Sequence, residues 1–370
     1  MITRVYLNNF RCFVNSEIKL ARINLLIGSN GSGKSSFLEA IHSVISLSVM
    51  SEAIEVAFPS STLTRWYPTT DQRVELDIEF EDGTYNYVLE ISHNPKLETV
   101  SLERELVKFD SRTIFLFEKG KVQLHNNQGV LGTQFPFRGS RSFLPQLEAR
   151  PENTLLTRFL EFLRRVWLLK LNPSGLSSES RAESDTLDTD GSNFSSWYRH
   201  LSQEYPEELP TLFKRISDTL LGFRSLRMIS TGGKGQKREL MAVFGVGNPE
   251  TKYEIDFSEI SDGERATIIL CCILMDVQSS SRILLLDEPE NFVGLQTIQP
   301  WLVDLADAMR DNSQLFLISH HPEVIDYLAA DHSVLFERPK GGPTRVRFEP
   351  FNRDQGLRAS ELMTRGLLDG

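Results

Sequence analysis

The chain has 370 residues, of which 40% are hydrophobic and 24% are charged, and its formal net charge is −10. This composition excludes a disordered or fibrous protein and provides enough apolar residues for a large core. The excess of acidic residues excludes a surface coated in basic residues, but it does not exclude a local basic groove that binds nucleic acid. No apolar run reaches the roughly 20 residues of a membrane span, and the first residues lack a signal-peptide core, so we expect a cytoplasmic protein without a membrane partner.

The first 150 residues predict a β-rich lobe. The runs ITRVYLNNF, EIKL and RINLLIG are typical of three short strands, and helical spacing follows over residues 34–49. Residues 73–80 alternate between polar and apolar, and the Asp-Gly pair at 82–83 then predicts a hairpin. Residues 98–135 continue as β structure, and we take 1–150 as the first lobe.

The middle of the chain, residues 151–224, predicts a helical insertion. Strong helical spacing covers 152–169 and returns after a loop over 174–193. That loop is rich in Ser, Asp and Glu, which predicts mobility. Residues 225–257 are typical of strands and open the last lobe, 225–370.

The run GSNGSGKS after the third strand matches the phosphate-loop pattern in full. Its glycines allow backbone N–H groups to curl around phosphates, and the start of the following helix adds its dipole. Lys34 would reach the β- and γ-phosphates, and Ser35 would hold Mg²⁺. The residues predicted to bind ATP here are Gly28, Ser29, Asn30, Gly31, Ser32, Gly33, Lys34, Ser35 and Ser36.

A second motif, RILLLDEPEN, spans residues 282–291. A short apolar strand ends there in carboxylates, which is the Walker B arrangement. Asp287 would act on Mg²⁺, directly or through water, and Glu288 would polarise an attacking water as the catalytic base. The alternative, an acidic turn after a strand, is weak beside a complete phosphate loop.

A third apolar strand, QLFLI, leads into Ser-His-His-Pro at residues 319–322. His320 comes directly off the strand, which favours a catalytic switch histidine that senses the γ-phosphate. His321 is assigned to local packing or solvent. A metal site on this pair is disfavoured because adjacent side chains point apart and no third ligand has a suitable spacing.

The stretch FSEISDGERATIILCCILMDV at 257–277 joins a polar turn to an apolar helix. Ser261 and Glu264 have the spacing of a capping box, which is one interpretation of the turn. The other is an anion site formed by the Ser261 hydroxyl, the Gly263 N–H and the helix N-terminus. Both interpretations stay open at this point.

In this order, GSNGSGKS, SDGER, LLLDEPE and ISHHP resemble the motifs of ABC-type ATPases. The opening VYLNNFRCFVNSEIKLARINLLIGSNGSGKSS is similar to the SMC/RecF-like branch, and more narrowly to stand-alone bacterial AAA ATPases related to the OLD-family ATPase domain. The resemblance implies an α/β P-loop ATPase head of two lobes. Its central sheet would be mixed or parallel, with an N-terminal antiparallel β part and a helical insertion, and the three segments would form one composite ATPase domain.

The resemblance also assigns site residues. It makes the signature loop, Ser261, Asp262, Gly263 and Glu264, a contact to ATP bound by a partner chain. The transporter signature has Gly at the place of Asp262 and Gln at the place of Glu264, so the loop departs from that branch. Arg11 is similar to a basic residue near the nucleotide base or α-phosphate. The Q-loop glutamine stays unassigned, since Glu75 occupies the corresponding strand and Gln72 lies nearby.

The function implied is an ATPase that uses ATP and Mg²⁺, dimerises head to head around two ATPs as a homodimer or part of a higher oligomer, and switches an effector. That effector would be a protein such as a nuclease encoded nearby, in antiphage defence. A RecF-like DNA-repair or DNA-loading ATPase is the alternative, and a transporter ATPase subunit is less favoured. The basic stretch 219–238 is compatible with DNA contact or with a solvated hairpin tip.

Overall fold

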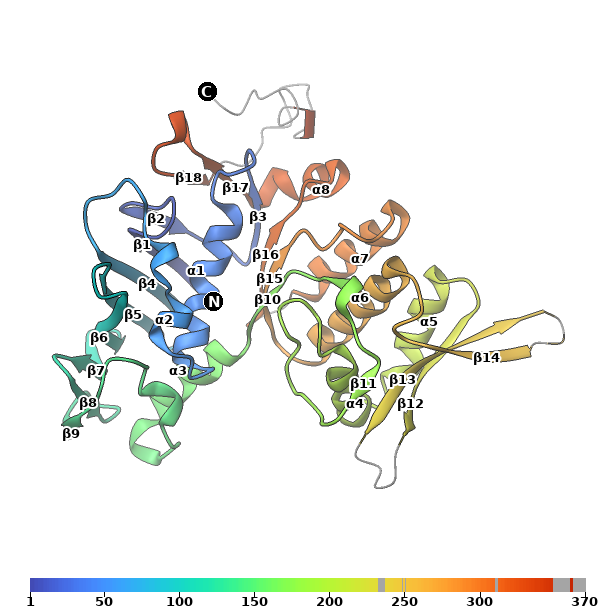
Figure 1. Cartoon of the computed structure of the whole chain (residues 1–370), viewed down its shortest axis with the longest axis horizontal. Coiled ribbons are helices and arrows are strands. Elements are labelled where there is room, and N and C mark those ends of the chain that lie inside the picture. The colour runs from blue at the N-terminus through green and yellow to red at the C-terminus, as the bar shows by residue number, and fades with distance from the viewer. Residues whose placement is uncertain (232–236, 248, 250, 310–311, 349–359, 362–370) are drawn as a thin grey trace. The chain divides into compact units, whose positions relative to one another are not determined.

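The computed structural model describes residues 1–231, 237–247, 249, 251–309, 312–348 and 360–361 (Figure 1). The chain forms two compact units. Unit 1 comprises Met1–Val166, Ile283–Leu285 and Asn312–Gly370, and unit 2 comprises Trp167–Arg282 and Leu286–Asp311. No helix among the described residues is long and apolar enough to cross a membrane.

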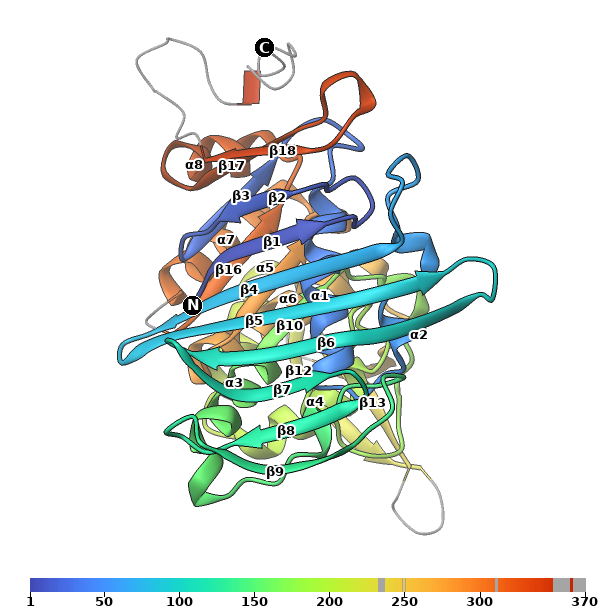
Figure 2. The same cartoon turned by 90° about the vertical axis from the view of Figure 1, so that its left-hand side faces the viewer.

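Unit 1 contains an eight-stranded sheet in the order β2-β1-β4-β5-β6-β7-β8-β9, which faces the viewer in Figure 2. Its pairings are antiparallel, and the predicted alternation over 73–80 is confirmed because Val74, Leu76 and Ile78 are all buried. The strands are β1 (Ile2–Asn8), β2 (Ser16–Lys19), β4 (Asp71–Phe80), β5 (Gly83–Asn94), β6 (Thr99–Phe109), β7 (Arg112–Glu118), β8 (Lys121–His125) and β9 (Leu131–Pro136).

A six-stranded sheet has the order β10-β15-β16-β3-β17-β18. β3 runs parallel to both β16 and β17, and the edge strand β18 is antiparallel. Every residue of β15, β16 and β17 is buried. Continuous burial of this kind is typical of parallel strands that are covered on both faces. The strands are β3 (Ile23–Ile27), β10 (Val166–Leu169), β15 (Ile283–Asp287), β16 (Gln314–Ile318), β17 (Ser333–Glu337) and β18 (Arg345–Phe348). The predicted α/β class, with a mixed sheet and an antiparallel β part, is confirmed.

The helices of unit 1 are α1 (Lys34–Ser48), α2 (Ile54–Ala57), α3 (Thr154–Arg164) and α8 (Pro322–His332). Phe37 of α1 lies against Phe316 and Phe336, whose ring centroids are 6.2 and 5.7 Å away. The helix predicted over 152–169 is wrong at its C-terminal end, because residues 166–169 form β10 instead. The Val-Trp-Leu-Leu run there is buried at every position, and sheet pairing overrides the helical spacing that precedes it.

Unit 2 is built around α6 (Asp262–Ser279), in which every residue from Arg265 to Val277 is buried. A helix that is apolar on all sides requires neighbours on all sides. The Trp301 indole N–H of α7 donates to the carbonyl of Leu270 at 2.7 Å, and Cys271 and Cys272 are buried free thiols. Around α6 lie α4 (Phe194–Glu204), α5 (Leu209–Thr219) and α7 (Leu295–Ala308), with β11 (Glu179–Ser180), β12 (Phe223–Ser230), β13 (Arg238–Val246) and β14 (Thr251–Asp256).

The acidic segment 174–193 belongs to unit 2. It contacts the rest of that unit through β11, which pairs with β13, and through the buried side chains of Leu176 and Leu187. Its mobility stays a prediction, as do the lobe boundaries 1–150, 151–224 and 225–370. Part of the basic stretch, including Lys234, falls outside the described residues. Elsewhere in that stretch Arg227 pairs with Glu254, and Lys237 pairs with Glu179 at 2.9 Å, as expected of a solvated hairpin.

Candidate nucleotide-binding site

The phosphate loop joins β3 to α1, as the sequence predicts. Gly28, Gly31 and Gly33 have φ angles of 142°, 77° and 110°, which side chains rarely tolerate. A Cβ at Gly28 would lie 2.1 Å from the Phe336 carbonyl oxygen, and one at Gly33 would lie 2.7 Å from the Cys12 sulfur. The loop therefore requires glycine both for its backbone path and for its close packing.

Lys34 is the first residue of α1 and is only 6% exposed. Its Nζ donates to the carbonyl oxygens of Gly28 at 2.7 Å and Ser29 at 3.1 Å. The ammonium group is therefore held by the loop itself. Because this side chain lies at the helix start, its charge adds to the positive end of the α1 dipole.

The start of α1 has the other properties of an anion site. Its N-cap, Gly33, provides no side-chain hydrogen bond, and the first turn contains no acidic residue. Ser35 and Ser36 in that turn are half-buried, and the buried hydroxyl of Ser32 has no hydrogen-bond partner among the described residues. N–H groups at a helix start, a buried cation and an unsatisfied hydroxyl are what phosphate oxygens accept hydrogen bonds from. The chemistry of this loop thus fits a polyphosphate.

Arg11 lies beside α1, where its guanidinium pairs with Glu39. Its φ of 51° is in the left-handed region, and its N–H donates to the Thr62 carbonyl at 2.5 Å. The backbone is therefore fixed, while the side chain is 42% exposed and pairs with Glu39, which lies five residues along α1 from Lys34. This position is compatible with the predicted contact to the nucleotide, which stays a prediction.

His320 follows β16, and β16 pairs with β3 in parallel, with Ile318 opposite Leu26. Parallel strands end at the same sheet edge, so His320 leaves the sheet one strand away from Gly28. His321 has a local structural function, since it is the N-cap of α8 and its Nδ1 accepts from the Glu323 N–H at 3.3 Å. Within unit 1 the structure therefore brings the phosphate loop, Arg11 and His320 to neighbouring elements.

In unit 2, Asp287 ends a fully buried strand and is itself 6% exposed. Its carboxylate pairs with Lys170 Nζ at 3.1 Å. Sequence reasoning missed Lys170, which lies 117 residues away and whose only signal is its position directly after the apolar run of β10. A carboxylate fixed at a strand end is suited to hold a metal ion, and the Lys170 ammonium would compete with that ion for the carboxylate.

Glu288 adopts a φ of 53°, and the Asn291 amide donates to its Oε2 at 2.8 Å. A glutamate in the left-handed region stores roughly 1 kcal/mol or more of strain, and such residues cluster at functional sites. The amide holds the carboxylate in one orientation. Glu288 is thus a positioned acceptor, which is what a general base requires.

The signature loop forms a complete capping box at the start of α6. Glu264 N–H donates to Ser261 Oγ at 3.4 Å, and the Ser261 N–H and hydroxyl both donate to Glu264 Oε2, at 3.0 and 2.7 Å. The Asp262 carboxylate accepts from Ser174 Oγ at 2.5 Å and pairs with Arg265, and these contacts lower the pKa of Asp262. A Cβ at Gly263 would lie 3.0 Å from the Phe292 carbonyl oxygen. The capping-box interpretation is therefore confirmed, and the anion-site interpretation stays a prediction.

Neither Q-loop candidate has an available side chain. Gln72 is buried, donates to the Asn9 carbonyl at 2.8 Å and contacts His93 through its Oε1, also at 2.8 Å. Glu75 pairs with Arg4 and Arg73. Both residues are satisfied within the antiparallel sheet, so the Q-loop position stays unassigned.

Comparisons with known proteins give one family profile that covers most of the chain. The family profile described as "AAA domain, putative AbiEii toxin, Type IV TA system" matches residues 23–326. Among solved structures, the SMC head domain from Thermotoga maritima aligns with 95% of this chain and 99% of its own, at 14% identity and a TM-score of 0.48. No curated protein matches the chain.

Proposed function

Since the chain belongs to the AAA_21 family of AAA domains, we propose that it binds Mg-ATP at Gly28–Ser36 and hydrolyses it. The observation that carries this proposal is the uncapped N-terminus of α1 with the buried ammonium of Lys34. A helix start without side-chain caps or acids, next to a fixed cation, stabilises bound phosphates. Arg11 then contacts the base or α-phosphate.

For the metal, Ser35 provides a hydroxyl and Asp287 a carboxylate, both oxygen ligands that Mg²⁺ prefers. A metal ion held by these ligands would neutralise charge on the phosphates. Glu288 accepts the proton of the attacking water, with its carboxylate oriented by Asn291. His320 senses the γ-phosphate from the neighbouring strand end. These roles are assigned from the chemistry of each residue and from its position in the order of the motifs.

We further propose that two chains close around two ATPs, as a homodimer or within a higher oligomer. In this arrangement the loop of Ser261, Asp262, Gly263 and Glu264 contacts the γ-phosphate bound by the other chain. Bound ATP then stabilises the dimer interface, and hydrolysis of ATP allows the dimer to open. Two-fold symmetry requires each chain to offer both halves of the interface, and the phosphate loop and the signature loop are those halves.

The output of the cycle is proposed to be a switch in a protein effector such as a nuclease encoded nearby, in antiphage defence. Support comes from the resemblance to OLD-related ATPases and from the toxin description of the family. A RecF-like DNA-loading ATPase is the rival, and exposed basic residues of β12 such as Arg224 favour it. Arg227 and Lys237 in the same stretch are already neutralised by glutamates, which weakens that support.

Steady-state ATP hydrolysis by the purified chain tests the proposal. The wild-type chain should hydrolyse ATP, and Glu288→Gln should bind ATP while its turnover falls by at least about 100-fold, as expected for loss of a general base. Exposed Glu259→Gln, in the turn before α6, is the matched control and should keep its turnover. Unchanged turnover in Glu288→Gln contradicts the assigned base. Strong stimulation by DNA with a steep salt dependence would favour the RecF-like rival.

A further inference from the structure

The antiparallel sheet of unit 1 ends at β9, and no described strand pairs with its outer edge. The six residues of β9, LGTQFP, include no charge. Val130 and Leu131 at its start are 61% and 48% exposed. Proteins usually protect edge strands with charged side chains, or cover them, because a bare edge accepts another strand. Among the described residues, the only protections that β9 has are a proline at its end and an irregularity in its register with β8. The rest of its edge is therefore suited to pair with another strand.

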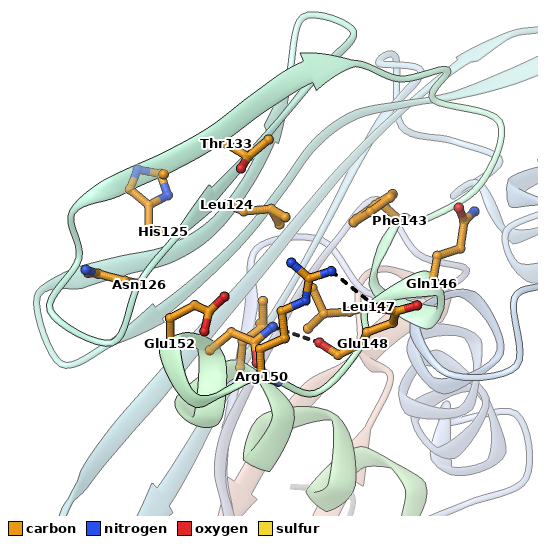
Figure 3. Close-up of a pocket in the computed structure, with 13 residues that line it drawn as sticks. Leu124, His125, Asn126, Thr133, Phe143, Gln146, Leu147, Glu148, Arg150 and Glu152 are labelled. Atoms are coloured by element: carbon orange, nitrogen blue, oxygen red, sulfur yellow. Dashed lines mark hydrogen bonds and ion pairs between the residues drawn. The ribbon is translucent and has the colours of Figure 1, made fainter.

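A cavity of about 370 Å³ lies beside β9. Gly132 and Thr133 of β9 line it, and side chains from the β8–β9 hairpin face those of the segment before α3 (Figure 3). Its apolar lining consists of Leu124, Phe143, Leu147 and Leu156, and its charged lining consists of Glu148, Arg150 and Glu152. The other side chains of the lining are polar, namely His125, Asn126, Thr133, Gln146 and Asn153. The cavity thus combines apolar walls with polar groups that can orient a ligand.

The charges of this cavity favour a cation. Arg150 pairs with Glu148 at 3.3 Å, but both side chains are largely exposed, at 61% and 81%, so the pair contributes at most about 1 kcal/mol. Glu152 forms no ion pair with any residue that the structure describes. Two carboxylates thus face one guanidinium. A lysine or arginine fits, because its aliphatic stem packs on Phe143 and Leu147 while its charged end reaches the carboxylates.

We propose that β9 and this cavity form a docking site for an extended segment of a partner protein, which pairs with the β9 edge and inserts a lysine or arginine. Main-chain hydrogen bonds supply affinity in this mode, and the side-chain pocket supplies specificity. The inference rests on the proposed function only in taking the partner to be the effector. A second copy of this chain fits less well, because its own β9 carries no cation and its cavity would bring more carboxylates.

Contacts within unit 1 connect the docking site to the phosphate loop. Ser142, directly before Phe143, donates to both oxygens of buried Glu105, at 2.9 and 2.8 Å. Glu105 also accepts from Tyr87 at 2.9 Å and from Ser48, the last residue of α1, at 3.4 Å. Arg141 donates to the Ser51 carbonyl at 2.7 Å. The wall of the cavity is thereby fastened to the C-terminal end of α1. We infer that docking changes nucleotide affinity at the other end of that helix.

Panning a displayed library of random decapeptides on the full-length chain tests the docking site. Recovered peptides should contain a lysine or arginine among β-branched residues. In fluorescence anisotropy they should bind the Glu148→Gln/Glu152→Gln chain at least about tenfold more weakly, from the loss of charge-assisted contacts. The exposed Glu98→Gln, in the β5–β6 turn of the same sheet, should bind as the wild type does. Recovery of no peptide, of peptides without basic residues, or of equal affinity for the double variant overturns the proposal. Dissociation of a homodimer by Leu131→Asp would assign the edge to a second copy instead and equally overturns it.

The coupling is tested by titrating a fluorescent ATP analogue with and without a recovered peptide. The peptide should shift the affinity of the wild-type chain severalfold, and should leave that of Ser142→Ala unchanged while binding it normally. Glu105→Gln is the second variant, because it keeps the shape of the side chain while changing its hydrogen bonds. The shift in this variant should also differ from that of the wild-type chain. An equal shift in the wild-type chain and both variants rules out the Glu105 connection. A chain that binds the peptide but no nucleotide would contradict the proposed function and leave the docking site standing.

Discussion

We propose that phosphate contacts the N-termini of α1 and α6, and these two helix starts are built in opposite ways. α1 begins at a left-handed glycine with no side-chain cap, no acid in its first turn and a buried lysine. α6 begins at Ser261, inside a complete capping box, with Asp262 and Glu264 in its first turn. Gly33 thus places no side-chain cap on the start of α1, whereas Ser261 and Glu264 cap the start of α6.

This difference indicates how each helix can bind an anion. At α1 no side-chain cap has to be displaced, so we expect phosphate binding there to need unit 1 alone. α6 must give up hydrogen bonds of its capping box, at a cost of about 1 kcal/mol, before the Ser261 hydroxyl can turn to a phosphate. Its acidic residues also oppose a second anion. A contact of α6 with phosphate therefore depends on the additional binding energy of a partner chain.

The largest expected effect is at α1. Lys34→Ala removes the buried cation and should weaken ATP binding by about 100-fold or more, as expected for the loss of several charge-assisted hydrogen bonds. Isothermal titration with ATP measures this. Lys19→Ala, an exposed lysine on β2, should bind like the wild type. If Lys34→Ala kept its affinity, α1 would be no better a phosphate site than α6.

Ser261→Arg should leave ATP binding by one chain intact and abolish ATP-dependent dimerisation, because the larger side chain blocks the face of α6 that meets the partner. Size-exclusion chromatography coupled to light scattering separates the two properties. Ser258→Arg, an exposed serine in the preceding turn, should still dimerise. Loss of ATP affinity in the Ser261→Arg monomer would mean that the loop acts within its own chain.

A smaller effect is expected where Lys170 pairs with Asp287. The ammonium competes with a metal ion for the carboxylate, so Lys170→Met should lower the Mg²⁺ concentration that half-saturates ATP hydrolysis. An ion pair with one exposed partner contributes up to about 1 kcal/mol, which corresponds to a shift of about fivefold at most. A higher Mg²⁺ requirement in Lys170→Met would instead show that the lysine helps to hold the phosphates.

The smallest effect concerns Glu105, where burial raises the pKa to about 7 from an ordinary value of 4.5. Between these values the folded chain keeps a proton that the unfolded chain has released, so this carboxyl stabilises the fold below pH 4.5 and that contribution is lost as pH rises toward 7. Glu105→Gln lacks this loss, so its Tm relative to the wild type should rise from pH 5 to pH 8. A constant or falling difference would exclude titration of Glu105 in this range.

Local patterns in the sequence predicted the features that neighbouring residues determine. Three such features are the strand, glycine loop and helix around Lys34, the Asp-Gly hairpin, and the capping box of Ser261. The residues that define each feature lie close together in the sequence, so their spacing alone identifies it. The end of α3 was missed because Val166–Leu169 continues a helical spacing and becomes β10 only through sheet pairing. Lys170 with Asp287, and Glu105 with Ser48 and Ser142, are brought together by the fold across long stretches of sequence. No local pattern carries such pairs.

The most direct test of the account is the mass of Glu288→Gln in solution, with and without saturating Mg-ATP. Slow hydrolysis should trap the closed state, so sedimentation equilibrium should give one chain without nucleotide and two chains with it. The same measurement on Glu288→Gln/Ser261→Arg should give one chain under both conditions. A Glu288→Gln chain that stays monomeric with ATP bound, or that dimerises equally without ATP, would contradict the account.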